Sequence, residues 1–293
     1  MILQALPAKS TTLGTLPIRR ALPRRERRLV GPWCFLDRYG PLSFSNRKPM
    51  DVAPHPHIGL QTVSWLLEGE IVHNDSLGSE ALVRPGELSL MTAGSGIAHT
   101  EETPAENSGK LNGVQLWVAL PDAARHRAAE FHHYTALPVI EQPGGVLRLI
   151  MGALAGRQSA GTNDFSPLIA AELTVHQGSA VALPLDAAFE HALLILDGEA
   201  SLEGQPLTAD VLYYLGLQRH SLELRSTHGA RCLLIGGTPL NEPVLLWWNF
   251  VARTNEELAD ARTDWESHQR FEEVKAYRGP RLAAPSFVPR PVR

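Results

Sequence analysis

The chain has 293 residues, 44% of them hydrophobic, and carries a formal net charge of −4. That length favours two domains over a single core, and the near-balanced charge argues neither for nor against an acidic ligand. No stretch reaches the ~18 consecutive apolar residues of a membrane-spanning helix, and the first residues lack the apolar core of a signal peptide. Both cysteines lie in apolar runs and are expected to be buried free thiols, which suits a reducing compartment. We therefore expect a soluble cytoplasmic protein with no membrane partner.

The first local feature is a cluster of six arginines between Arg19 and Arg28, in the stretch IRRALPRRERRLVGP. Such clusters bind nucleic acid in some proteins. Here Pro23 and Glu26 interrupt the cluster, which leads directly into the apolar stretch WCFLDRY. We therefore interpret it as a solvated edge strand and loop, and nucleic acid is a disfavoured partner.

Two groups of short apolar runs, separated by Gly, Pro, Asn and Asp, then follow along the chain. The predicted strands are TVSWLL, EIVHND, LSLMTA, GVQLWVAL, VLRLIMG, AELTVH, SAVALPL, HALLILDG, VLYYLG, SLELRS and ARCLLIGG. Many short strands with turn residues between them are typical of a β-sandwich or barrel. The sequence thus predicts an all-β fold, with an N-terminal domain at residues 1–120 and a C-terminal domain at residues 146–293.

The stretch between the two groups and the end of the chain have different patterns. Residues 121–145 show no sustained strand pattern and are interpreted as a linker. We predict a helix from about Asn255 to Phe271, because apolar residues recur there at helical spacing. These residues are Leu258, Ala261, Trp265 and Phe271. The Pro-rich residues 280–293 are predicted to be extended.

The two groups of strands are related by an internal repeat. SWLLEGEI at residues 64–71 matches LLILDGEA at residues 193–200 in pattern, with an apolar run, an acid, a glycine and a glutamate. A spacing this long indicates a duplicated domain and not a solenoid repeat. Counted back from the two glycines, His55 and His57 of the first copy fall opposite Pro184 and Asp186. The second copy therefore lacks the histidine pair.

The first copy carries a candidate ligand set. His55 and His57 are separated by one residue, so on a strand both side chains project from the same face. His99 and Glu101 repeat this spacing after a glycine-rich turn. Three imidazoles and a carboxylate from two strands can converge inside a small barrel. The alternative is that each histidine is an ordinary surface or core residue, but two such pairs in one β-domain favour a site.

This donor set suits a divalent transition metal. Neutral imidazole and carboxylate bind Fe, Mn, Ni, Cu and Zn, and four protein ligands leave two positions of an octahedron open. Two open positions on a redox-capable metal allow a bidentate oxygen ligand, or one organic oxygen together with dioxygen.

These motifs resemble those of the cupin superfamily, and more closely those of the pirin family of bicupins. The matching stretches are PHPHIGLQTVSWLLEGE, VHNDSLGSEALVRPGELSLMTAGSGIAHTEETP, NGVQLWVALP and NEPVLLWWNFVARTNEEL, together with the arginine-rich lead. They extend over nearly the whole chain, although the C-terminal domain matches mostly by pattern. The resemblance implies two cupin (jelly-roll-like) β-barrels in tandem with a C-terminal helix. It also implies one metal ion, iron(II), with His55, His57, His99 and Glu101 as ligands.

Several positions around the predicted site have alternative interpretations. The general cupin motif has Glu where this chain has Gln61, which leaves the surroundings of the ligands open. Leu60 and Met91 are candidates for an apolar substrate pocket, with core packing as the alternative. Gln115 is a candidate polar residue of that pocket, with the strand surface as the alternative.

The resemblance implies a function in two versions. The first is a quercetin 2,3-dioxygenase-type reaction on a flavonol or related phenol with dioxygen, in which Glu101 accepts the hydroxyl proton. A metal-bound carboxylate is a weak base, so this role requires a labile bond to the metal. The second is an iron-dependent redox sensor that binds a transcription factor or enzyme as its protein partner. Isomerase or hydrolase chemistry of other cupins is a third alternative, because the fold does not fix the function.

Overall fold

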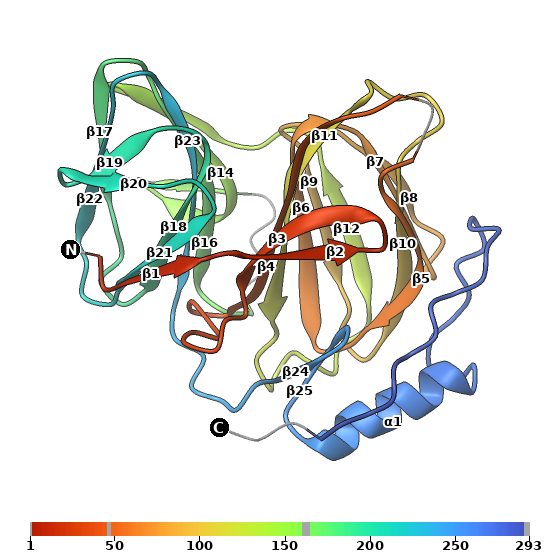
Figure 1. The fold of residues 1–293 in the computed structure, drawn as a ribbon. Helices are drawn as coiled ribbons and strands as arrows, with labels where there is room; N and C mark the ends of the chain where they lie inside the picture. The colour runs from red at the N-terminus through yellow and green to blue at the C-terminus, as the bar shows by residue number, and fades with distance from the viewer. Residues whose placement is uncertain (1, 46–47, 160–164, 290–293) are drawn as a thin grey trace. The chain divides into compact units, whose positions relative to one another are not determined.

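The computed structural model describes residues 2–45, 48–159 and 165–289 (Figure 1). Over these residues the chain forms 25 strands and one helix, which confirms the predicted all-β fold with a C-terminal helix. Each run that the sequence predicts as a strand lies in or overlaps one. Within the described residues, no helix combines the length and the apolar character that crossing a membrane requires.

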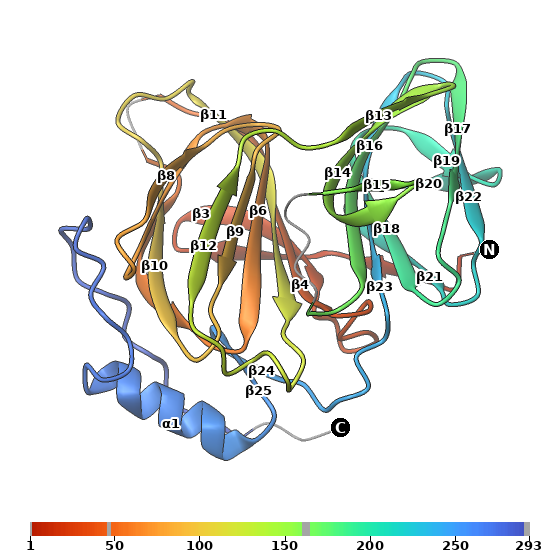
Figure 2. The same cartoon turned by 180° about the vertical axis from the view of Figure 1, so that it is seen from behind.

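Two sheets form the N-terminal barrel. One has the order β5-β10-β7-β8, and the other has the order β12-β9-β6-β11-β4-β3-β2. Figure 2 shows β12, β9 and β6 side by side from behind. The strands are β2 (Lys9–Leu13), β3 (Leu16–Leu22), β4 (Trp33–Ser43), β5 (Asp51–His57), β6 (Leu60–Gly69), β7 (Ile71–Asp75), β8 (Glu80–Val83), β9 (Leu88–Thr92), β10 (Ile97–Glu102), β11 (Lys110–Ala119) and β12 (Glu130–Tyr134).

A second pair of sheets repeats this plan. One has the order β1-β21-β18-β23-β16-β14-β13, with β15 paired to β14, and the other has the order β17-β22-β19-β20. The strands are β1 (Gln4–Pro7), β13 (Val139–Gln142), β14 (Gly145–Leu154), β15 (Arg157–Gln158), β16 (Leu168–Val175), β17 (Ser179–Pro184), β18 (Glu190–Gly198), β19 (Ala200–Leu202), β20 (Gln205–Leu207), β21 (Val211–Gly216), β22 (Ser221–Ser226) and β23 (Ala230–Gly237).

The last elements of the chain are a short hairpin and the helix. They are β24 (Leu245–Trp247), β25 (Phe250–Ala252) and α1 (Asn255–Glu266). In both cartoon views α1 lies beside the hairpin (Figures 1 and 2), and its buried residues Leu258, Ala261 and Trp265 share an apolar cluster with Leu245 and Phe250.

By its contacts the chain divides into two units. The first barrel unit comprises Thr11–Ile18, Arg38–His133 and Asn241–Arg293, and the second comprises Met1–Ser10, Arg19–Asp37 and Tyr134–Leu240. The hairpin and the helix thus belong to the unit that holds β5 and β10, whereas the sequence placed them in the C-terminal domain. The first strand of the chain, β1, pairs with β21 of the second barrel unit.

Two local features differ from the expectation. The stretch 121–145, expected to be a linker, contains β12 and β13, whose few alternating residues are too short a signal to separate from a loop, and the boundary between the two units falls inside it, between His133 and Tyr134. The helix begins at Asn255 as predicted, with a capping box between Thr254 and Glu257, but it ends before Phe271. His268 and Arg270 adopt left-handed backbone conformations, with φ of 57° and 62°, which end the helical path.

Alternation along β6 separates the two faces of its sheet. The pairing of β6 with β9 and β11 is regular from Leu60 to Trp65, so Leu60, Thr62 and Ser64 share one face. Ser64 bonds Glu101 of β10 in the facing sheet, so we call this the inner face of the barrel. An apolar core of this barrel is formed by Leu16, Ile18, Tyr39, Met50, Val52, Leu66, Ile71, Val83 and Leu111.

Candidate metal centre

Strand register brings three histidines together in the N-terminal barrel. His55 and His57 lie at the end of β5, and His99 lies on β10, which pairs antiparallel with β5. In that pairing His99 is directly opposite His55, and Ile97 is opposite His57. The period of two along each strand therefore places all three imidazoles on one side of the same sheet.

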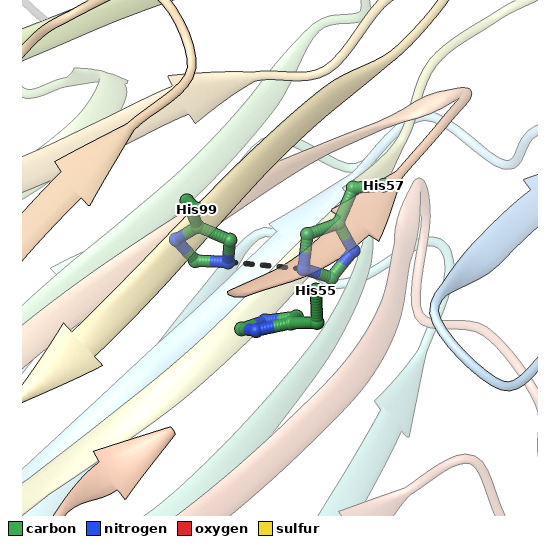
Figure 3. A group of neighbouring side chains, drawn as sticks. All are labelled: His55, His57 and His99. Atoms are coloured by element: carbon green, nitrogen blue, oxygen red, sulfur yellow. Dashed lines mark hydrogen bonds between the residues drawn. The ribbon is translucent and has the colours of Figure 1, made fainter. Parts of the chain in front are cut away.

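The three side chains, which we call the histidine cluster, point toward one another (Figure 3). The Nε2 atoms of His57 and His99 are 3.1 Å apart. The ring of His55 is centred 5.0 Å from that of His57 and 4.3 Å from that of His99. One ligand nitrogen from each ring lies within 4.8 Å of the others, and all three residues are buried.

Backbone carbonyls fix the tautomer of two of these rings. Nδ1 of His55 is 2.9 Å from the carbonyl of Ala53, and Nδ1 of His57 is 2.9 Å from the carbonyl of Asn249. A carbonyl only accepts, so each Nδ1 must carry the ring proton, and Nε2 of the neutral ring keeps its lone pair. This is the tautomer that a metal-binding imidazole needs.

Burial keeps the three rings neutral. It lowers the pKa of His55 to about 4 and the pKa of His57 and His99 well below the ordinary value, because a charged ring would lose its hydration. The Nε2 lone pairs of His55 and His57 are therefore available to a cation in this buried site. Three imidazole nitrogens are also a donor set for Fe, Ni, Cu or Zn, so the residues present fit a transition-metal ion.

Glu101 lies on β10 two residues after His99, but its carboxylate is outside the group of three nitrogens. Its Oε1 accepts a hydrogen bond of 3.1 Å from Ser64 Oγ, which is also 2.7 Å from Gln115 Oε1. Burial raises the pKa of Glu101 to about 7, although the hydrogen bonds from Ser64 and Gln115 act to lower it. The pairing of β10 with β5 shifts register between His99 and Glu101.

The candidate pocket residues lie on the inner face of the barrel. Gln115 pairs with Ser64 across β6 and β11 and is half-buried. Leu60 is on the same face of β6, and Met91 is opposite Thr62; both are fully buried. Trp117 lies edge-on to His57 with ring centres 5.1 Å apart.

Gln61, at the position of the general cupin glutamate, lies on the other face of β6. Its Nε2 donates to Thr92 Oγ1 over 3.0 Å, and Thr92 is its partner in the pairing of β6 with β9. Because side chains alternate along a regular strand, Gln61 does not share the inner face with Ser64.

Two contacts of the cluster were missed or left open by sequence reasoning. The carbonyl of Asn249, which bonds His57, lies in the turn between β24 and β25, and a backbone acceptor leaves no side-chain signal in the sequence. The stretch VHNDSLG fits two interpretations from sequence: His73, Asn74 and Asp75 reach the pocket, or they form a hairpin turn with Asx hydrogen bonds. The structure shows both: Asp75 accepts backbone hydrogen bonds in the turn, and His73 Nδ1 is 3.4 Å from His99 Nδ1.

Part of the arginine cluster forms ion pairs within the second barrel unit. Three of its six members form ion pairs there: Arg19 with Asp210, Arg20 with Asp37 and Arg27 with Glu190. The guanidinium of Arg27 also lies 3.3 Å from the centre of the Tyr214 ring. The side chains of Arg19 and Arg20, on β3, are still 41% and 36% exposed, and Arg25 and Arg28 are exposed, as expected of a solvated strand and loop; Arg27 is more buried, at 22%.

Known proteins match the chain over its full length. Residues 15–118 match the family described as Pirin, and residues 170–272 match the Pirin C-terminal cupin domain. A Pseudomonas aeruginosa protein with the provisional name quercetin 2,3-dioxygenase is 44% identical over 97% of this chain and 90% of its own. A pirin-like protein of Caulobacter vibrioides is 36% identical over 91% of this chain and 94% of its own. The crystal structure of quercetin 2,3-dioxygenase from Acinetobacter baumannii superposes with a TM-score of 0.94, at 43% identity, over 100% of this chain and 97% of that one.

Proposed function

Because the chain belongs to the pirin family of bicupins, we propose that the histidine cluster and Glu101 together hold one divalent transition-metal ion, iron(II), for oxygenase chemistry. The observation that carries the proposal is the convergence of three neutral imidazoles in a buried site, two of them with the tautomer already set by backbone carbonyls. Such preorganisation is typical of metal ligands, whose second ring nitrogen is held by a hydrogen-bond partner.

The reaction proposed is that of a quercetin 2,3-dioxygenase, with a flavonol or a related phenol as substrate. This activity is in the names of the relatives from Pseudomonas aeruginosa and Acinetobacter baumannii. When bound, the metal supplies the chemistry with dioxygen, which is incorporated as the flavonol heterocycle opens and carbon monoxide is released. The part of the protein is to orient the substrate, exclude water and accept a proton.

Glu101 is proposed to accept the proton of the flavonol hydroxyl at its carboxylate, besides serving as the fourth ligand. Without the metal, burial raises the pKa of Glu101 to about 7, which suits a base at neutral pH; coordination lowers that pKa, so the role as base requires a labile bond between Glu101 and the metal. Ser64 Oγ lies 3.1 Å from one carboxylate oxygen of Glu101 and 2.7 Å from Gln115 Oε1, and it leaves the other carboxylate oxygen to receive the proton. Leu60 and Met91 would offer apolar contacts to the aromatic rings from the inner face.

The test is dioxygen uptake by the iron-loaded full-length protein with quercetin, with carbon monoxide release as a second readout. We expect uptake by the wild type and a loss of turnover of about 10²–10⁴-fold in Glu101→Gln, the usual contribution of general acid–base catalysis. Iron occupancy should change less, because three imidazoles remain and the amide keeps a carbonyl oxygen.

Glu102→Gln is the matched control, since it makes the same change on the next residue. Glu102 accepts from Asn74 and Thr100, so it should keep wild-type turnover. If wild-type protein with verified iron takes up no dioxygen with any flavonol, the dioxygenase proposal is wrong. Full turnover in Glu101→Gln would remove Glu101 as the proton acceptor but leave the reaction in place.

A further inference from the structure

His99 differs from the other two histidines of the cluster in what its Nδ1 contacts. His55 and His57 donate to backbone carbonyls, which can only accept. His99 Nδ1 instead lies 3.4 Å from Nδ1 of His73, a ring nitrogen that can either donate or accept. The tautomer of His99, and with it the availability of its Nε2 to a metal, therefore depends on the tautomer of His73.

Asp75 determines the tautomer of His73. One carboxylate oxygen, Oδ1, accepts the backbone N–H groups of Leu77 and Ser79, each over 2.9 Å. The other, Oδ2, is 3.1 Å from His73 Nε2. Burial raises the pKa of Asp75, but the hydrogen bonds from His73 and Ser79 outweigh it and lower that pKa. The ionised carboxylate can only accept, so Nε2 of His73 must donate.

The positions of the ring protons of His73 and His99 follow from this hydrogen bond between His73 and Asp75. When the Nε2 proton is the one ring proton of His73, its Nδ1 has a lone pair, and this lone pair accepts from Nδ1 of His99. His99 then carries its proton on Nδ1 and keeps a lone pair on Nε2. That atom is the one that lies 3.1 Å from Nε2 of His57.

The scaffold holds this chain of rings in place. In the pairing of β10 with β7, His99 is opposite Asp75 and Glu101 is opposite His73. The His73 ring stacks on Phe131 of β12, with centres 4.1 Å apart and planes 7° from parallel. His73 and Asp75 are both buried, so solvent does not compete for their hydrogen bonds.

We propose that Asp75 and His73 are positioning residues that place the proton of His99 on Nδ1 and thereby keep its Nε2 free to bind the metal. This inference rests on the metal site proposed above. Neither residue touches the metal or the substrate; they act through His99. Partners that orient a ligand in this way typically change metal affinity about 10–100-fold when they are removed.

Asp75→Asn tests the direction of the proton chain. The amide oxygen can still accept from Leu77 and Ser79, which turns the amide N–H₂ toward His73. Nε2 of His73 must then accept, so its Nδ1 carries the proton and His99 is left with its proton on Nε2. We expect about a 10–100-fold loss of iron(II) affinity in an anaerobic competition titration against a chromophoric chelator. ¹⁵N spectra of the metal-free protein should show His99 in the opposite tautomer from the wild type.

Two substitutions of His73 separate proton placement from packing. His73→Asn keeps an acceptor oxygen near the position of Nδ1 but loses the ring. His73→Phe keeps the ring stacked on Phe131 but offers His99 no acceptor. If His73 acts through the His99 tautomer, the Asn variant binds iron(II) more tightly than the Phe variant. If His73 only fills space, the order is reversed.

Failure of the positioning role and failure of the metal site give different results. Unchanged iron(II) affinity and an unchanged His99 tautomer in Asp75→Asn would overturn the inference, as would tighter binding by His73→Phe than by His73→Asn. Failure of the wild type to bind any iron(II) would instead refute the metal site. The ¹⁵N comparison needs no metal, so it would still show whether Asp75 sets the tautomer of His99. Glu102→Gln serves as the control, because its carboxylate bonds Asn74 and Thr100.

Discussion

The histidine cluster is an unfavourable arrangement in the absence of a cation. Its rings are buried and neutral, and the Nε2 atoms of His57 and His99 face each other at 3.1 Å; in the tautomers that a metal site requires, both atoms are acceptors. A buried polar group without a partner costs about 1–3 kcal/mol. A divalent ion removes this cost at several nitrogens at once, so metal binding should both fill the site and stabilise the barrel around it.

At the scale of single residues, His57 contacts both His99 and the β24–β25 turn. His57→Ala removes one nitrogen directly and leaves the carbonyl of Asn249 without its donor. Iron(II) affinity should fall by more than the roughly 10–100-fold that is typical for loss of an outer partner. The change is measured by anaerobic titration, with circular dichroism to confirm the fold.

His126→Ala is the control for that substitution, because His126 is exposed and lies in a turn far along the chain from β5. It should bind iron(II) as the wild type does. Undiminished affinity in His57→Ala would show that the cluster is not the metal site. A variant that fails to fold would show that His57 has a structural role of its own.

The spacing of residues predicts part of this site and not the rest. A period of two along a strand is enough to place His55 beside His57, and one pairing then adds His99. It does not reveal the register shift between His99 and Glu101, which alters where the carboxylate points. Nor does it reveal the carbonyl of Asn249, 192 residues from His57, because a backbone acceptor leaves no side-chain signal.

At the scale of elements, the β24–β25 hairpin is held against the end of β5. Val251 N–H donates to the carbonyl of Ile58 over 3.1 Å, and the chain turns at Gly59 with φ of 68°. A Cβ atom at Gly59 would lie 2.1 Å from the carbonyl oxygen of Val251. Only glycine allows the hairpin to approach closely enough for Asn249 to hold His57.

Gly59→Ala should therefore weaken both the fold and the metal site. Gly14→Ala is the matched control: Gly14 has a similar φ of 56°, but nothing lies within 4 Å of an added Cβ. In urea unfolding, the free energy of unfolding of the control should fall only by the roughly 1–2 kcal/mol that a left-handed backbone costs a non-glycine residue. Its iron(II) affinity should be unchanged. Gly59→Ala should lose more stability and bind iron(II) more weakly. Equal losses in the two variants would show that the close approach of the hairpin does not matter.

The ends of elements are harder to predict than their existence. Apolar periodicity locates α1 and the long strands because burial repeats along many residues. The helix continues to Phe271 by that criterion, since Phe271 is buried and its ring is 5.7 Å from that of Trp265. Its backbone is no longer helical there, so a residue can belong to the packed face after the helix has ended. Apolar periodicity also does not predict β12, because this strand is short and rich in histidine.

At the scale of the whole molecule, the two barrels keep the same local geometry but not the same site. Gly69 and Gly198 align in sequence, and both are left-handed, with φ of 88° and 72°. An added Cβ at either would lie within 2.2 Å of a backbone oxygen of the paired strand. The repeat therefore preserves the position where a strand turns against its neighbour, while the residues equivalent to the histidine pair have changed.

The second barrel unit has no comparable donor set at that place. Pro184 and Asp186, at the positions equivalent to His55 and His57, are exposed. They line a cavity of about 220 Å³ together with His191, which is buried and whose pKa burial lowers to about 4. One imidazole and one exposed carboxylate are too few ligands for a tightly held transition metal. Among the described residues, the histidine cluster is the one group of three or more metal-binding side chains.

We therefore expect one iron ion per chain, as measured by elemental analysis of protein loaded with excess iron(II) and then desalted anaerobically. His99→Ala should reduce that content to near zero, because it removes a ligand of the cluster. His191→Ala makes the same change at a buried histidine of the other barrel and should leave the content at one. Retention of two ions per chain, or loss of an ion in His191→Ala, would show that the second barrel also holds metal. The duplication would then have kept two sites, and the exchange of the histidine pair for Pro184 and Asp186 would have to be explained by a different ligand set.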